Sequence, residues 1–129
     1  MLDNYSIEFD CYITSSNTDY GFGVEIANAS QVAFISLNDY NRCTYRSATD
    51  THDTYQYGSY TALTRCWVHF KYTIRNNTLT MEISKNNVVA VTISVNLDNI
   101  LSSNTIKYRL MSMWSTGERY IKNIIVDGL

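Results

Sequence analysis

The chain lacks several features that would point to particular classes of protein. It contains no proline, five glycines and two histidines in 129 residues, and we draw no conclusion about the fold from the missing proline. No apolar run approaches the roughly 20 residues that a membrane-spanning helix needs, so we expect no membrane insertion. The first residues form neither a basic nor an apolar segment, so we expect no signal peptide in this sequence.

The charge of the chain also excludes a class of partner. The formal net charge is −2, and the ten Lys and Arg residues are scattered along the sequence. A nucleic-acid-binding surface needs clustered cations, so we expect no nucleic-acid partner. With 45% hydrophobic residues the chain can bury a core, and its length fits one domain over residues 1–129.

The three cysteines, Cys11, Cys43 and Cys66, show no C-x-x-C spacing. The spacing excludes a zinc cluster, and the odd number excludes complete pairing in disulfides. Cys11 lies in an apolar row and is expected to be buried, whereas a Cys43–Cys66 bridge and three free thiols are both open. The two histidines, His52 and His69, have no H-x-H or H-E-x-x-H spacing and predict no metal site.

The chain is rich in Asn, Ser, Thr and Tyr. The first three make up nearly a third of the residues, and there are 11 tyrosines. Asn, Ser and Thr are poor helix formers, whereas Thr and Tyr suit pleated sheets. The composition therefore indicates an all-β protein.

Apolar and polar residues alternate along most of the chain, as in half-buried strands. The clearest stretch is "CWVHFKYTIRNNTLTMEISKNNVVAV", residues 66–91. It predicts three consecutive antiparallel strands joined by Asn-Asn turns at 76–77 and 86–87. In the first of these strands Trp67, His69 and Lys71 face outward. The third strand is expected to place Val89 in one inward row with the apolar residues at 91, 93 and 95.

Other alternating segments complete the expected fold. Strands are predicted at 4–14, 22–29, 31–37, 105–115 and 119–129, with shorter ones around Cys43–Arg46 and Thr54–Tyr57 and a helical turn around Leu97–Leu101. In the last strand Ile121, Asn123 and Ile125 are expected to share one face. About ten to twelve strands at this spacing predict an all-β protein with a two-sheet antiparallel β-sandwich of the jelly-roll type.

Residues 38–64 differ from the rest because they are polar and rich in tyrosine. Aromatic rings beside Asn, Asp and Arg suit a saccharide, whose ring faces are apolar and whose hydroxyls need hydrogen-bond partners. The same composition suits a protein contact, or a tyrosine-rich surface without any ligand. The candidate ligand-binding residues are Tyr45, Arg46, Tyr55, Tyr57 and Tyr60, joined by Trp114 and Arg119 if the hairpin near the end of the chain lies beside this segment.

Several segments resemble the concanavalin A-like jelly roll, in particular its laminin-G-like branch. "CWVHFKYTI" resembles a strand of that family, "RNNTLTMEISKNNVV" resembles the hairpin after it, and "RYIKNIIVDG" resembles the last strand, which closes the sandwich beside a first strand like "YSIEFDCYI". Asn stands where Gly is usual in the "KNN" turn, and Glu82 lies near a position where an aromatic residue is common. Such degenerate motifs identify a fold better than a function.

The resemblance implies carbohydrate binding without catalysis. The retaining β-glucanases of this superfamily carry an E-x-D-x-(x)-E strand whose outer carboxyls lie about 5–5.5 Å apart. Glu8 and Asp10 match the first half of this motif, but Tyr12 and Ile13 stand where the second glutamate would be. We therefore predict no enzyme activity.

The resemblance also implies two structural features. Some members of the superfamily hold a structural calcium ion at the rim of the sandwich, for which Asp50, Asp53 and Asp127 are the candidates here; no other cofactor is predicted. Calcium takes six to eight oxygen ligands, and the chain has no D-x-D-x-D cluster. Trp67 is expected to pack at a sheet edge.

These observations predict a non-catalytic, lectin-like module of a larger protein, such as a phage tail or receptor-binding protein or a microbial surface adhesin. Its location would be the extracellular surface or a virion, and its partner a cell-surface or environmental polysaccharide. A protein partner or a homo-oligomer is open within such an assembly. The alternatives are a structural or protein-interaction module without a sugar ligand and a degenerate glycoside hydrolase.

Overall fold

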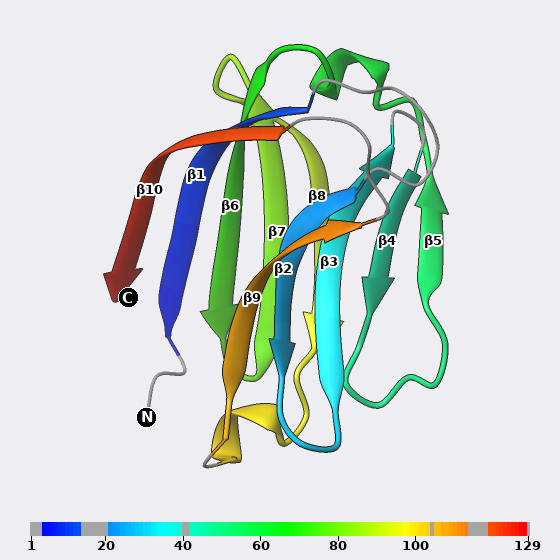
Figure 1. The fold of residues 1–129 in the computed structure, drawn as a ribbon, viewed down its shortest axis with the longest axis vertical. Helices are drawn as coiled ribbons and strands as arrows, with labels where there is room; N and C mark the ends of the chain where they lie inside the picture. Colours follow the sequence, from blue (N-terminus) through cyan, green and yellow to red (C-terminus); the bar gives the residue numbers. More distant parts are fainter. Residues whose placement is uncertain (1–3, 14–20, 40–41, 104, 114–118, 129) are drawn as a thin grey trace.

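Two antiparallel sheets packed face to face make up the protein (Figure 1). The computed structural model describes residues 4–13, 21–39, 42–103, 105–113 and 119–128. Within these ranges there are ten strands, five in each sheet. The predicted all-β, two-sheet antiparallel sandwich is thus confirmed.

The first and last strands of the chain are neighbours at one edge of the same sheet. Sheet A runs β10 (Arg119–Gly128), β1 (Tyr5–Ile13), β6 (Trp67–Arg75), β7 (Thr78–Lys85) and β8 (Val88–Asn96). Sheet B runs β5 (Thr54–Tyr57), β4 (Arg42–Arg46), β3 (Val32–Asp39), β2 (Gly21–Ala27) and β9 (Lys107–Met113). In Figure 1, β10 lies at the left and β5 at the right.

Helical structure is limited to two short 3₁₀ helices in the described ranges, η1 (Thr61–Leu63) and η2 (Ile100–Ser102). The second overlaps the predicted helical turn around Leu97–Leu101. None of the helices in the described ranges has the length and apolar character needed to cross a membrane.

The predicted three-strand meander is present as β6, β7 and β8. Asn76 and Asn77 adopt φ of 53° and 58°, and Asn86 and Asn87 adopt 52° and 64°. Two successive positive φ values are the conformation of a type I′ turn, which matches the twist of the flanking strands. Asparagine tolerates this conformation, which explains why Asn-Asn pairs without glycine close both hairpins.

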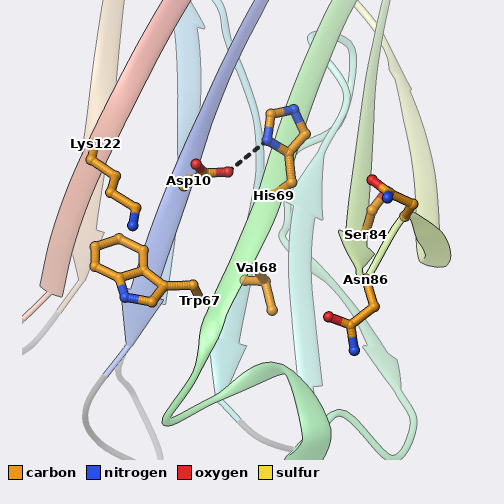
Figure 2. A pocket seen from close by; sticks show the side chains of 8 residues that line it. Asp10, Trp67, Val68, His69, Ser84, Asn86 and Lys122 are labelled. Atoms are coloured by element: carbon orange, nitrogen blue, oxygen red, sulfur yellow. Dashed lines mark hydrogen bonds and ion pairs between the residues drawn. The ribbon is translucent and has the colours of Figure 1, made fainter.

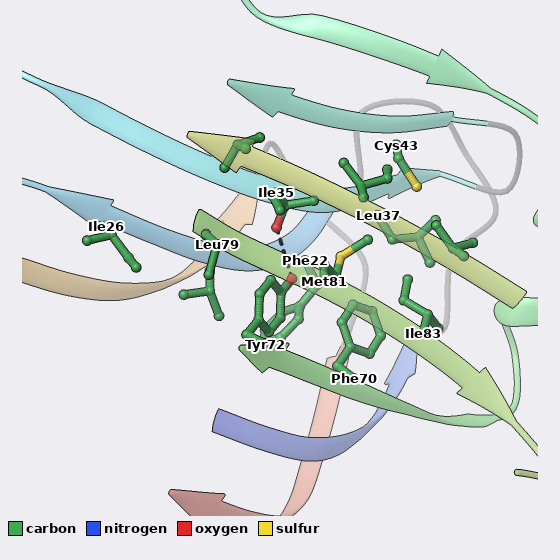
Figure 3. Packing of buried hydrophobic residues seen from close by; sticks show 14 of the residues in the cluster. Phe22, Ile26, Ile35, Leu37, Cys43, Phe70, Tyr72, Leu79, Met81 and Ile83 are labelled. Atoms are coloured by element: carbon green, nitrogen blue, oxygen red, sulfur yellow. Dashed lines mark hydrogen bonds between the residues drawn. The ribbon is translucent and has the colours of Figure 1, made fainter. Parts of the chain in front are cut away.

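The core lies between the sheets and is built from alternate residues of each strand. In β6, Val68, Phe70, Tyr72 and Ile74 are buried, while the residues between them face outward. Figure 3 shows Phe70 and Tyr72 of sheet A packing toward Ile35 of sheet B. Each large apolar side chain buried in this way contributes roughly 1.5–3 kcal/mol.

A bulge in β10 changes which residues share a face. The register of β1 and β10 shifts between Glu8 and Asp10, and Asn123 adopts a φ of 57° at that point. An extra residue in one strand reverses the alternation beyond it. Ile125 therefore pairs with Glu8, faces outward as Glu8 does, and is 46% exposed. The prediction that Ile125 shares a face with Ile121 is therefore wrong.

A second bulge lies between β7 and β8. The register shifts between Ile83 and Ser84, so Val89 pairs with Ser84 and is 52% exposed. Val91, Ile93 and Val95 are buried as predicted. The prediction that Val89 belongs to this inward row is wrong, because the bulge turns its side chain to the outer face.

None of the three cysteines forms a disulfide. Cys11 and Cys43 are fully buried in the core, and partly buried Cys66 donates a hydrogen bond of 3.1 Å to the carbonyl oxygen of Ala62. The Cys43–Cys66 bridge that the sequence left open is thus not present.

Candidate functional site

The outer face of β4 and β5 carries the main cluster of predicted site residues. We call it the tyrosine face and define it as Arg42, Arg46, Tyr55 and Tyr57. Strand register sets this face: Tyr57 pairs with Arg42 and Tyr55 pairs with Thr44, while the intervening Cys43 points into the core. The rings of Tyr55 and Tyr57 are 48% and 69% exposed.

Charged groups hold this surface in place. The guanidinium of Arg42 lies 4.7 Å from the centre of the Tyr55 ring, a cation–π contact. The side chain of Arg46 forms an ion pair of 2.9 Å with Asp53 and donates a hydrogen bond of 3.2 Å to the carbonyl oxygen of Thr51. The face therefore combines two exposed rings with two anchored cations.

Two of the predicted tyrosines do not belong to this face. Tyr60 is only 9% exposed and is part of the core; its ring lies across Gly58, and its hydroxyl accepts a hydrogen bond of 3.1 Å from Gln56. Burial raises the pKa of its hydroxyl. Tyr45 pairs with Ile35 on the inner side of sheet B and packs partly buried against the core. The expectation of an exposed ring is therefore wrong for Tyr60, and Tyr45 lies on the other face of β4 from the tyrosine face.

The described strands do not bring the hairpin near the end of the chain next to the tyrosine face. Arg119 begins β10 and pairs with Ile13 of β1 in sheet A, whereas β5 is an edge strand of sheet B. Trp114 and the side chain of Arg119 lie outside the described part of the chain.

The predicted calcium candidates lie in separate places. Asp50 accepts a hydrogen bond of 3.0 Å from the backbone of Ser47, and Asp53 pairs with Arg46. Asp127 lies on β10, where it pairs with Ser6. Among the described residues, no three His, Cys, Asp or Glu side chains gather in a way that could hold a metal ion.

A second polar and aromatic cluster lies on the outer face of sheet A. It borders an open hollow of about 500 Å³, the Trp67 hollow, lined among others by Asp10, Trp67, His69, Ser84, Asn86, Asn87 and Lys122 (Figure 2). Trp67 and His69 face outward, as predicted. Trp67 is not packed at a sheet edge, because β6 is the central strand of sheet A and the side chain is 42% exposed.

Two rows of side chains cross the strands at this hollow. The polar row is Lys122, Asp10, His69 and Ser84, which are register neighbours on β10, β1, β6 and β7. The aromatic row is Tyr120, Tyr12 and Trp67, which are register neighbours on β10, β1 and β6. The ring centres lie 6.3 Å apart for Tyr12 and Tyr120 and 5.7 Å apart for Tyr12 and Trp67.

Contacts within the polar row fix its members. His69 Nδ1 lies 2.9 Å from Asp10 Oδ1, and His69 Nε2 lies 3.2 Å from Glu8 Oε1. A neutral imidazole has one N–H, so both contacts are hydrogen bonds only when the ring is protonated. The amide of Asn123 donates a hydrogen bond of 2.8 Å to Asp10 Oδ2, and this bond, followed by that from His69, lowers the pKa of Asp10. Lys122 Nζ lies 4.0 Å from the centre of the Trp67 ring.

Comparison with known proteins bears on the fold. No protein-family profile and no curated protein matches the sequence. A functionally unknown Saccharomyces cerevisiae protein aligns with a TM-score of 0.70 at 9% identity, over 100% of this chain and 71% of that chain. Chicken galectin 2 aligns with a TM-score of 0.58 at 9% identity, over 95% and 89%. The fold is that of a galectin-like β-sandwich.

A phage protein shares this fold as well. The CBM2 module of the evolved Dit of Lactobacillus casei BL23 phage J-1 aligns with a TM-score of 0.59 at 6% identity, over 97% of this chain. The present chain spans 61% of the length of that phage chain. At such identities the likeness describes the architecture alone.

Proposed function

We propose that this protein is a non-catalytic carbohydrate-binding module whose ligand lies on the tyrosine face. The observation that carries the proposal is the exposure of Tyr55 and Tyr57 side by side on β5, next to Arg42 and Arg46. Exposed rings supply flat apolar area, while guanidinium groups supply hydrogen bonds for hydroxyls. Because Arg46 is held by Asp53, little side-chain entropy is lost when a ligand binds.

The fold supports a binding role, as does the incomplete carboxylate motif, in which Tyr12 and Ile13 stand where the second glutamate would be. The galectin and the phage CBM2 module have the same architecture. Glu8 and Asp10 each contact His69 and lie on the opposite outer face from the tyrosines. The parent protein we propose is a phage tail or receptor-binding protein or a microbial surface adhesin, at the cell surface or in a virion.

A glycan array followed by isothermal titration calorimetry tests this function. We expect at least one saccharide to bind, with Tyr57→Ala and Tyr55→Ala each weakening binding by about tenfold or more, as for a central aromatic contact. Tyr108→Ala is the matched control, because Tyr108 is 40% exposed in sheet B but lies at the opposite edge, against Tyr5. The proposal would be refuted if no saccharide on a broad array bound, or if Tyr57→Ala and Tyr108→Ala weakened binding equally.

A second candidate function is contact with a second copy of this chain through β10. Ile124, Ile125 and Val126 are 59%, 46% and 64% exposed on this edge strand. An edge strand with apolar side chains is a template for pairing with another strand. Light scattering after size-exclusion chromatography decides this: a dimer that Ile124→Lys converts to a monomer supports it, and a wild-type monomer at high concentration contradicts it.

A further inference from the structure

We propose a second saccharide-binding surface at the Trp67 hollow, which takes a neutral oligosaccharide. It lies on the outer face of sheet A, whereas the tyrosine face lies on the outer face of sheet B. The two surfaces share no residue. The inference therefore does not depend on the tyrosine face, and each surface can be tested without the other.

The aromatic row provides the apolar part of this surface. Trp67 and Tyr120 are 42% and 49% exposed, and Tyr12 lies between them in edge-to-face contact with both. The three rings lie in a row across three neighbouring strands, with neighbouring ring planes inclined by 66° and 62°. An oligosaccharide can place the C–H groups of its sugar rings against the exposed parts of Trp67 and Tyr120, because aromatic side chains bury large area with little loss of entropy.

The polar row runs beside the aromatic row and provides hydrogen bonds. His69 is fixed between Asp10 and Glu8, and Lys122 is fixed over the Trp67 ring. Ser84 and the Asn86-Asn87 turn close the opposite side of the hollow (Figure 2). Donors and acceptors thus border the hollow on both sides, and those of His69 and Lys122 are held in place, which is what recognition of a hydroxyl-rich ligand needs.

The charges of this surface favour a neutral ligand. The carboxylates of Glu8 and Asp10 are balanced by Lys122 and by His69 when its ring is protonated. In the next register position Lys71 lies between Glu8 and Glu82. An anionic sugar would bring a charge with no surplus cation to balance it, and desolvating an unbalanced charge is costly.

Nuclear magnetic resonance of the indole N–H groups tests the proposal. The chain has two tryptophans, so the Trp67 signal is assigned as the one that disappears in Trp67→Phe. The probes are neutral oligosaccharides of glucose, galactose, mannose and N-acetylglucosamine, with sialylated oligosaccharides as the anionic comparison. We expect a neutral oligosaccharide to shift the Trp67 signal in the wild type and equally in Tyr57→Ala.

Two substitutions separate binding from folding. We expect Trp67→Ala to weaken that binding by about tenfold or more, and Lys122→Ala to weaken it while leaving the amide spectrum folded. Lys107→Ala is the control, because Lys107 is an exposed lysine on β9 in the other sheet. Three results would overturn the inference: no shift from any neutral probe, a shift from sialylated probes alone, or a Trp67 shift that Tyr57→Ala abolishes.

Discussion

The hydroxyl of Tyr72 donates a hydrogen bond of 2.9 Å to the backbone carbonyl oxygen of Ile35, which joins the two sheets through the middle of the core (Figure 3). Tyr72 belongs to β6 and Ile35 to β3, and both side chains are buried. A buried hydroxyl without a partner would cost free energy. Because its hydroxyl has this partner, Tyr72 can occupy an inward position of β6, where the strand pattern requires only an apolar side chain.

Removing this hydroxyl is expected to destabilise the fold modestly. Tyr72→Phe keeps the ring but loses the hydrogen bond, so the free energy of unfolding should fall by about 1 kcal/mol. Tyr57→Phe is the control, because Tyr57 is 69% exposed and should change stability by less than about 0.5 kcal/mol. Urea unfolding measures both, and equal effects would show that the inter-sheet bond contributes nothing.

Gly23 is expected to tolerate no side chain. A Cβ atom at this position would lie 2.2 Å from the carbonyl oxygen of Ile35 and 2.6 Å from Cα of Ser36, both in the backbone of the neighbouring strand. Gly23→Ala should therefore lower the free energy of unfolding by about 3 kcal/mol or prevent folding.

The control for this prediction is Gly128→Ala. A Cβ at Gly128 would meet no atom within 4 Å, so a change below about 0.5 kcal/mol is expected. Thermal melts followed by circular dichroism compare the two variants. A Gly23→Ala protein as stable as the wild type would mean that β2 and β3 can separate at little cost.

Asp10 is expected to contribute to the pH dependence of stability. Its pKa is lowered from the ordinary 3.8, first by the Asn123 hydrogen bond and then by His69. A carboxyl group with a lowered pKa in the folded state stabilises it at pH values above its unfolded pKa. This contribution is lost as the pH falls through the folded pKa, so Asp10→Asn should flatten the decline of stability below about pH 4.

The cause of the lowered pKa can be tested separately. Asn123→Gly removes the amide donor, and glycine tolerates the φ of 57° at this bulge. We expect the pKa of Asp10, followed by carboxyl carbon resonances, to rise toward 3.8 in this variant. An unchanged pKa would assign the effect to His69 alone.

Thiol labelling is expected to separate the three cysteines. Cys66 is partly exposed, whereas Cys11 and Cys43 are fully buried. A thiol reagent should therefore label one cysteine in the folded protein and three after unfolding without reductant, as counted by mass spectrometry. The Cys66→Ser variant should show no label while folded. One label after unfolding would instead indicate a disulfide.

Sequence patterns predicted the strands better than they predicted the site. The short strands expected around Cys43–Arg46 and Thr54–Tyr57 appear as β4 and β5. Within them, Tyr55 and Tyr57 are exposed, but Tyr60, three residues beyond β5, is in the core. Tyr60 lies between strands, where no alternation applies, so nothing local indicated that its ring would turn inward.

The Trp67 hollow shows the same limit. Alternation predicted that Trp67 and His69 share an outward face. Asp10 lies beside His69, which is 59 residues away in sequence, because β1 pairs with β6. The amide of Asn123 reaches Asp10 across 113 residues because β1 also pairs with β10. The sequence pattern does not show either pairing.

The sequence by itself determined the all-β class, the Asn-Asn turns and the inward row of β6, because these follow from local conformational preference and a period of two residues. Tertiary structure alone decided which rows meet across strands, where the bulges at Asn123 in β10 and between Val89 and Val91 in β8 reverse a face, and which tyrosines are exposed. These outcomes depend on long-range strand pairing, and a shift of one residue in register moves every side chain beyond it to the other face.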